Sequence, residues 1–306
     1  MKNSLLIILS TFIFTACSFS NQAKIKETKS INVFTNYVSN SYYKKDEGYD
    51  WVSVNLSKYD ENTIKVKVRS RADKKTPTCT LDTFAYKVDK NKYNFYSEGK
   101  TLELLIYENK IELKGKTKDD EIALYYFCSG GGSLKGDYFK YEKSLDKEQI
   151  DKRAYVNSLS YGKYRFYIDS SDNKLTIKTY DLKYSKEPFV HEIKGQVVFS
   201  EIADINNDTN PEIYIYLNEN IEGKTYGKLI AYSVNAAVSM SEIYLAPLKY
   251  NKELSSSYFG NDEFRVVKNT LVRRYPLKNG KIKQIQYKLV AGEATWQLKI
   301  DKILEY

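Results

Sequence analysis

The chain has 306 residues and a formal net charge of +9, with 48 Lys and Arg residues against 39 Asp and Glu residues. It contains three cysteines and one histidine, His191, a composition that argues against a zinc site of the usual Cys/His type. Carboxylates are plentiful, but no ordered catalytic set can be named, so we expect a protein that is not an enzyme and needs no cofactor. The 29 tyrosines, the 5 prolines and many short alternating segments predict an all-β chain.

Residues 1–16 have the pattern of an export signal. Lys2 precedes the apolar stretch Leu5–Phe14, and Ala16 stands directly before Cys17. A charged start, an apolar core of roughly 7–15 residues and a small residue before the cleavage site are typical of a secretory signal. The apolar stretch is too short for a membrane span, which needs about 20 residues. With a cysteine at this place the segment resembles a bacterial lipoprotein signal; the alternative is an ordinary signal peptide followed by an incidental cysteine.

The lipoprotein resemblance implies that Cys17 carries lipid and anchors the protein to a membrane. Ser18 follows the cysteine, which in Gram-negative lipoproteins implies the outer membrane and hence a periplasmic protein. Residues 17–30 are polar and predict a tether. Because an exported protein does not meet nucleic acid, we expect no nucleic-acid partner and assign the surplus positive charge to contact with anionic headgroups.

The segment 31–141 predicts a small β-barrel-like domain. Its clearest strand is Thr63–Arg69, where Ile64, Val66 and Val68 alternate with basic residues. Cys79 and Cys128 remain after Cys17 is set aside, and an even pair in an exported chain indicates one disulfide rather than two free thiols. The same alternation predicts strands at 50–56, 102–107, 110–113, 164–168, 174–179, 284–290 and 296–303.

The charged segment 142–154 lacks a strand pattern and predicts a linker, short and helical in form. It would join the first domain to a second one, 155–306. The predicted architecture is therefore two small antiparallel β-sandwich or barrel domains in tandem.

Within the second domain, the apolar runs Glu212–Leu217 and Gly227–Val234 flank a segment that we predict to be a nine-residue loop, 218–226. Loops held between strands often carry function. The loop ends in Gly223-Lys224-Thr225-Tyr226, followed by Gly227, which would supply flexibility, hydrogen-bond donors and an aromatic anchor.

Six blocks in order, from about residue 161 to 306, carry a family resemblance. They read NPEIYIY, TYGKLIAYSVN, SEIYLAPL, YFGNDEF, NTLVRRYP and QYKLVAGEATWQLKIDKI. This half of the chain resembles the bacterial periplasmic inhibitors of i-type (invertebrate-type) lysozymes. The resemblance implies an all-β fold and a loop inserted into the substrate cleft of a lysozyme, with a lysozyme as the partner. Whether the protein also forms a homodimer is left open.

The tip of the predicted loop departs from the family signature, a Ser-Gly-x-Tyr-like run. Tyr226 and the following Gly227 match, but Gly223 stands at the serine and Lys224 at the glycine. Thr225 offers a displaced hydroxyl. An ammonium from Lys224 beside a catalytic carboxylate would replace the lost hydroxyl contact with a charged one.

Charge bears on this hypothesis because an inhibitor of a cationic enzyme gains from an acidic face. From residue 151 onward there are 23 Lys and Arg residues against 19 Asp and Glu residues. The stretch 201–222 nevertheless holds six acidic residues and no Lys or Arg. Two alternatives are open: these residues form an acidic surface beside the loop, or strand alternation scatters them over unrelated faces.

Two further motifs are candidates for a site. Arg273 and Arg274 lie in succession on one predicted strand and point to opposite faces, so at most one would meet a partner, while the other pairs internally with Asp262 or Glu263. Oxygen-bearing side chains also recur at calcium-loop spacing, although Thr209 replaces the expected glycine and a solvated turn is the alternative. This weak calcium candidate comprises Asp204, Asn206, Asp208 and Glu212.

The alternative to an inhibitor is a non-catalytic envelope module that binds glycan, calcium or another envelope protein.

Overall fold

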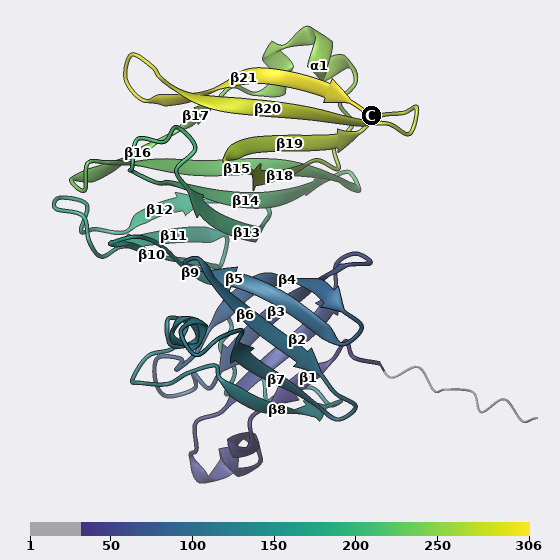
Figure 1. The fold of residues 1–306 in the computed structure, drawn as a ribbon, viewed down its shortest axis with the longest axis vertical. Coiled ribbons are helices and arrows are strands. Elements are labelled where there is room, and N and C mark those ends of the chain that lie inside the picture. The colour runs from purple at the N-terminus through teal and green to yellow at the C-terminus, as the bar shows by residue number, and fades with distance from the viewer. Residues whose placement is uncertain (1–31) are drawn as a thin grey trace, which may run out of the picture. The chain divides into compact units, whose positions relative to one another are not determined.

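The computed structural model describes residues 32–306, and residues 33–306 form one compact unit (Figure 1). The predicted signal 1–16, the lipidation site Cys17 and the predicted tether 17–30 lie outside the described residues. In the described part, no helix is both long enough and apolar enough to cross a membrane. The fold is all-β, as the sequence predicts, and most strand pairs are antiparallel.

The first half is a closed barrel of eight strands, each paired with the next and the last paired with the first. Its interior holds apolar side chains, among them Ile64, Val66 and Val68, which the alternation along β3 (Thr63–Ser70) assigns to one face. The 3-10 helices η1 (Asn40–Glu47) and η2 (Asp120–Tyr125) lie between strands. The strands are β1 (Asn36–Val38), β2 (Val52–Lys58), β3 (Thr63–Ser70), β4 (Leu81–Asp89), β5 (Lys92–Ser97), β6 (Lys100–Ile106), β7 (Lys110–Gly115) and β8 (Gly136–Tyr141).

The predicted disulfide is confirmed: Cys79 and Cys128 are bonded, with 49 residues of sequence separation and Cα atoms 4.1 Å apart. The bond ties the start of β4 to the segment after η2. Closing a loop of this length removes conformational freedom from the unfolded chain, which stabilises the fold by roughly 4 kcal/mol on the chain-entropy account.

The second half contains three sheets rather than one barrel or a two-sheet sandwich. The first sheet has the order β12-β11-β10-β9, the second β13-β14-β15-β16, and the third β17-β21-β20-β19-β18, in which only β17 and β21 are parallel. The strands of the first two sheets are β9 (Tyr155–Tyr161), β10 (Tyr164–Ser171), β11 (Lys174–Thr179), β12 (Phe189–Glu192), β13 (Gln196–Ala203), β14 (Glu212–Ile221), β15 (Lys224–Asn235) and β16 (Ser239–Glu242). The third sheet comprises β17 (Tyr244–Leu245), β18 (Glu263–Val267), β19 (Thr270–Pro276), β20 (Ile282–Ala291) and β21 (Trp296–Glu305), with η3 (Leu248–Tyr250) and α1 (Lys252–Ser256) before β18.

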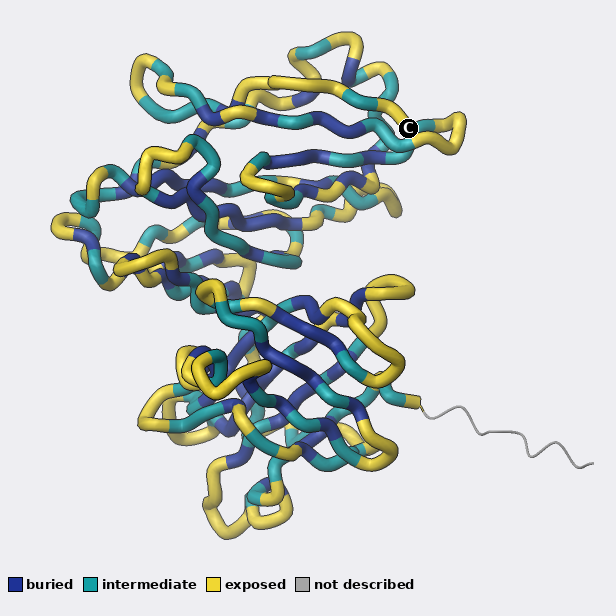
Figure 2. The backbone as a smooth tube through the Cα atoms, viewed as in Figure 1, coloured by how far each residue is buried: buried dark blue, intermediate teal, exposed yellow. Residues whose placement is uncertain are grey.

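Within the middle sheet, residues 212–217 of β14 are buried on both faces, which is visible as a dark run in Figure 2. Ile213, Ile215 and Leu217 pack with the first sheet, and Tyr214 and Tyr216 pack with the third. Successive residues of a strand point to opposite faces, so an unbroken apolar run is what a strand between two layers requires.

The segment 142–154 contains turns and no helix, so the expectation of a short helical linker was wrong. Asp151 explains part of its conformation, because its carboxylate accepts hydrogen bonds from the backbone and the side chain of Arg153. In the sequence, the hydrophobic cluster of the barrel precedes this segment and the clusters of the three sheets follow it. All of these residues nevertheless belong to one compact unit. The division into domains 31–141 and 155–306 stays a prediction.

Replacing Ile215 by Ala should lower the free energy of unfolding by about 2–5 kcal/mol, because the side chain is fully buried between two sheets. Urea unfolding followed by tryptophan fluorescence measures the change. The matched control is Ile221→Ala at the exposed end of the same strand, which should change stability by no more than about 0.5 kcal/mol. Equal losses for the two variants would contradict the two-faced burial of β14.

Candidate functional site

The segment 218–226 is not a loop. β14 continues to Ile221, β15 begins at Lys224, and three further residue pairs extend the ladder beyond Asn218↔Gly227. A two-residue turn joins the strands, with positive φ at Glu222 (51°) and Gly223 (77°), the pattern of a type I′ hairpin turn. The sequence did not predict this part of the two strands, because residues 218–222 are exposed or half-buried and show no apolar alternation. Backbone pairing between the strands continues the hairpin there without a buried face.

This hairpin extends past both neighbouring strands. Pairing with β13 ends at Asn218, and pairing with β16 involves only residues 232–235 of β15. We use the name tip for residues 221–224, all of which are exposed. Lys224 makes no ion pair with another described residue, and Ile221 is 45% exposed. The tip therefore presents an apolar side chain and an ammonium group to solvent on a hydrogen-bonded ribbon.

The other predicted loop residues lie at the base of the hairpin and serve packing. The ring of Tyr226 meets the ring of Tyr258 edge-on with centroids 5.9 Å apart, so Tyr226 is not a free aromatic anchor. Gly227 is buried, and a Cβ added there would lie 2.8 Å from the carbonyl oxygen of Asp262. Thr225 is half-buried, and its carbonyl accepts a hydrogen bond from the Asn261 amide (2.6 Å).

Asp262 is the centre of the network that holds this base, and its side chain is fully buried. Its Oδ1 accepts hydrogen bonds from the Gly227 amide (2.7 Å) and the Tyr258 hydroxyl (2.6 Å). Its Oδ2 accepts from Arg273 Nε (2.7 Å). The guanidinium of Arg273 lies 4.9 Å from the ring centroids of both Tyr258 and Phe264. The prediction that one arginine of the pair bonds internally is thus confirmed for Arg273.

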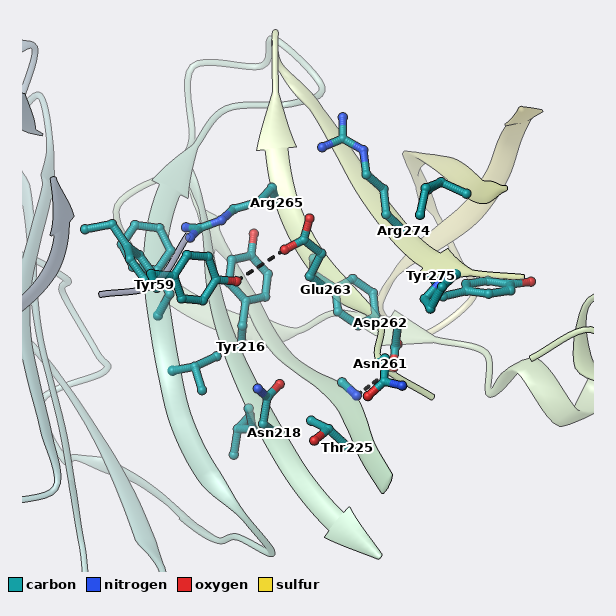
Figure 3. Close-up of a pocket in the computed structure, with 18 of the residues that line it drawn as sticks. Tyr59, Tyr216, Asn218, Thr225, Asn261, Asp262, Glu263, Arg265, Arg274 and Tyr275 are labelled. Carbon is teal, nitrogen blue, oxygen red and sulfur yellow. Dashed lines mark hydrogen bonds between the residues drawn. The ribbon is translucent and has the colours of Figure 1, made fainter. Parts of the chain in front are cut away.

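Arg274 points to the opposite face, as strand geometry requires, and lines a cavity of about 540 Å³ (Figure 3). Cross-strand pairing places Arg274 opposite Glu263, and Arg265 follows two residues along β18 on the same face. Tyr59 donates a hydrogen bond to Glu263 (3.3 Å, dashed in Figure 3). Three parts of the chain therefore line the cavity. They are strands β18 and β19, the base of the hairpin with Asn218 and Thr225, and the barrel with Tyr59 and Lys65.

Sequence reasoning named Asn218, Thr225, Gly227, Asp262, Glu263 and Arg274 without joining them in one cavity, and it missed Tyr59, Lys65, Asn261 and Arg265. Asn261, Glu263 and Arg265 lie in or next to the YFGNDEF block, where the Gly-Asn-Asp run signals a turn before a strand. Tyr59 and Lys65 come from the barrel, and no local signal in the sequence links them to β18.

The acid-rich stretch does not form an acidic approach to the tip. Asp204 and Glu212 are buried, and Glu201 accepts hydrogen bonds from the Tyr216 hydroxyl (2.5 Å) and the Val266 amide (2.8 Å). Glu219 pairs with Lys228 at 3.3 Å. Of the six acidic residues, Glu222 alone lies in the tip. The tip also contains Lys224, so its negative and positive charges are equal in number.

The weak calcium candidate is a turn whose carboxylates accept hydrogen bonds from backbone amides. Asp204 accepts from the amides of Asp208 (3.0 Å) and Thr209 (2.9 Å), and Glu212 accepts from Ile205 (3.0 Å). Among residues 32–306, no group of three or more His, Cys, Asp or Glu side chains is arranged to hold a metal ion. Through these contacts Asp204 and Glu212 hold the turn that precedes β14, and the calcium role of the four residues stays a prediction.

No protein-family model matches the chain, and no curated protein matches it. Among solved structures the chain is similar to the Drosophila Semaphorin 1b extracellular domains 1–2, with 10% identity and a TM-score of 0.26. The match covers 89% of this chain and 79% of that chain. A likeness at this level supports no argument about function.

Replacing Asp262 by Asn should destabilise the protein by about 3–5 kcal/mol, because it leaves the buried guanidinium of Arg273 without its counter-charge. The amide of Gly227 should also exchange with deuterium faster. Chemical unfolding and hydrogen exchange measure the two effects. Asp181→Asn is the control, since it breaks an Asp–Arg pair with an exposed Arg165 and should cost no more than about 1 kcal/mol.

The buried carboxyl of Glu212 should make stability fall with rising pH. Burial, and next the charges of Asp204 and Asp208, raise its pKa to about 8 in the folded protein. The unfolded chain has a pKa near 4.3, so between about pH 4.5 and 8 the folded state binds more protons and loses stability as pH rises. Glu212→Gln should gain stability over wild type by a few kcal/mol across this window, measured by unfolding at pH 5 and pH 8. A constant difference at both pH values would contradict this assignment.

Proposed function

We propose that this protein is a non-catalytic inhibitor that blocks a lysozyme, of the invertebrate type by the resemblance of its second half, with the tip of the β14–β15 hairpin in the substrate cleft. The observation that supports the proposal is the hairpin itself. It extends past its neighbouring strands and exposes the tip, residues 221–224. A narrow two-stranded ribbon has the shape needed to enter a cleft.

The chemistry of the tip suits a glycosidase. Such enzymes place two carboxyl groups on either side of the scissile bond. The ammonium of Lys224, which has no ion-pair partner among the described residues, would donate to one of these carboxylates as a charge-assisted hydrogen bond. Ile221, its directly opposite partner in the ladder, would fill adjacent apolar space.

The base of the hairpin favours tight binding because it is preorganised. The buried carboxylate of Asp262 holds the Gly227 amide, and the Asn261 amide bonds the Thr225 carbonyl. A ribbon already held in one conformation loses little entropy when it binds. Tyr226 belongs to this support through its contact with Tyr258, so we assign it a positioning role.

The predicted signal and the lipid at Cys17 complete the proposal: they would place the inhibitor in the periplasm, anchored to the outer membrane, where a lysozyme that attacks the cell wall arrives.

The double substitution Ile221→Ala/Lys224→Ala should weaken inhibition at least tenfold, because two contacts at the centre of an interface contribute more than about 1.4 kcal/mol. Inhibition constants are measured in a cell-wall lysis assay with c-, g- and i-type lysozymes. Lys163→Ala is the matched control, since Lys163 lies at the exposed two-residue turn between β9 and β10. Failure of the wild-type protein to inhibit any of the three classes would refute the proposal.

A further inference from the structure

The cavity beside the hairpin base gathers positive charges that the protein itself leaves unpaired. Lys65, Arg265 and Arg274 all line it. None of the three forms an ion pair within 4 Å among residues 32–306, although Lys and Arg side chains elsewhere form many such pairs. Asp262 is already bonded to the buried Arg273, so Glu263 is the one carboxylate side chain of the lining without a cationic partner.

Each of the three cations is held in place by other contacts. Arg265 lies over the neighbouring rings of Phe84 and Phe199, with its guanidinium carbon 4.7 Å and 3.9 Å from the two ring centroids, and its Nη1 is buried with no hydrogen-bond partner among the described residues. Lys65 Nζ lies 5.3 Å from the centroid of the Tyr59 ring.

Arg274 is oriented by a single hydrogen bond, from Nε to Gln284 Oε1 (2.7 Å). Its two terminal nitrogens have no acceptor among the described side chains. They form the planar fork that binds a carboxylate through two parallel hydrogen bonds.

The rest of the lining has the chemistry of a sugar site. Asn218 and Asn261 supply amides, Thr225 supplies a hydroxyl, and Tyr59 supplies a ring that is 45% exposed (Figure 3). Amides and hydroxyls match the hydroxyl and acetamido groups of a saccharide, and an exposed ring packs against its apolar face. A volume of about 540 Å³ lies within the range of small-molecule sites.

We infer that this cavity binds an acidic saccharide, a sugar that bears a carboxylate, with Arg274 on the carboxylate and Tyr59 against the ring. Arg265 and Lys65 add to the positive potential, and Asn218, Asn261 and Thr225 contact the neutral polar groups. The cavity does not include the tip, so the inference does not depend on lysozyme inhibition. If the protein is instead a glycan-binding envelope module, the inference names the class of glycan that it binds.

Two disaccharides that differ by one lactyl group test the inference by isothermal titration calorimetry with the purified protein. One is N-acetylglucosaminyl-N-acetylmuramic acid, which carries a lactyl carboxylate, and the other is N,N′-diacetylchitobiose, which lacks it. The acidic disaccharide should bind at least about tenfold more tightly, the difference expected for a charge-assisted bidentate contact. Equal affinity for the two sugars, or no binding of the acidic one at 10 mM, would overturn the inference.

Substitutions assign the contact to residues. Arg274→Gln should weaken binding of the acidic disaccharide about tenfold or more and leave the neutral one unchanged. Lys65→Gln, on the exposed side of β3, should weaken binding of the acidic disaccharide about two- to fivefold. This second variant tests the contribution of positive charge if Arg274→Gln impairs folding. Arg165→Gln, at an exposed pair far along the chain, is the control and should change nothing.

Two further measurements distinguish a saccharide site from a general anion site and from the hairpin tip. Inorganic phosphate that binds as tightly as the acidic disaccharide would mean a general anion site and would refute the saccharide assignment. The tip variant Ile221→Ala/Lys224→Ala should retain full sugar affinity, which distinguishes a failure of this inference from a failure of the inhibitor proposal.

Discussion

The burial of β14 between two layers of side chains is the constraint on which the second half of the molecule depends. Its odd-numbered isoleucines and leucine pack with the first sheet and its even-numbered tyrosines with the third. Both sheets are therefore fixed relative to one strand, and that strand continues as one arm of the hairpin. An aromatic layer strengthens this arrangement, since the rings of Phe199, Tyr216 and Phe264 follow one another in near-parallel pairs. The hairpin is thus the extension of the most buried element of the sheets.

Rigidity at the hairpin base has a second source in Asp262. A buried carboxylate is costly unless its oxygens are satisfied, and here the bonds come from β15, from β19 and from the segment before β18. One side chain therefore couples the middle sheet to the third sheet at the point where the hairpin leaves the sheet. The same arrangement uses one arginine of the Arg273-Arg274 pair internally and leaves the other on the opposite face of β19, in the lining of the cavity.

Patterns that depend on burial were readable from the sequence. Alternation predicted the strands at 63–69, 110–113 and 174–179, and the even cysteine count predicted the disulfide. The prediction failed where pairing continues without burial, because Asn218–Ile221 has no apolar face to reveal a strand. The charge count along the stretch 201–222 left two alternatives open, and the fold favours the scatter of its acids, because it buries Asp204 and Glu212 and pairs Glu219 with Lys228.

The cavity shows why a site of this kind is hard to predict from sequence. Lys65 and Tyr59 come from the barrel, whereas Arg265 and Arg274 come from the last sheet, about 200 residues later. Lys65, Arg265 and Arg274 each fit an ordinary local role on a strand, and Tyr59 directly follows the end of β2. Their significance arises only in three dimensions, where three cations without an ion-pair partner among the described residues line one cavity. In a chain of net charge +9, the total charge is therefore less informative than the place where cations without an ion-pair partner gather, and it is from this gathering that we infer the ligand class.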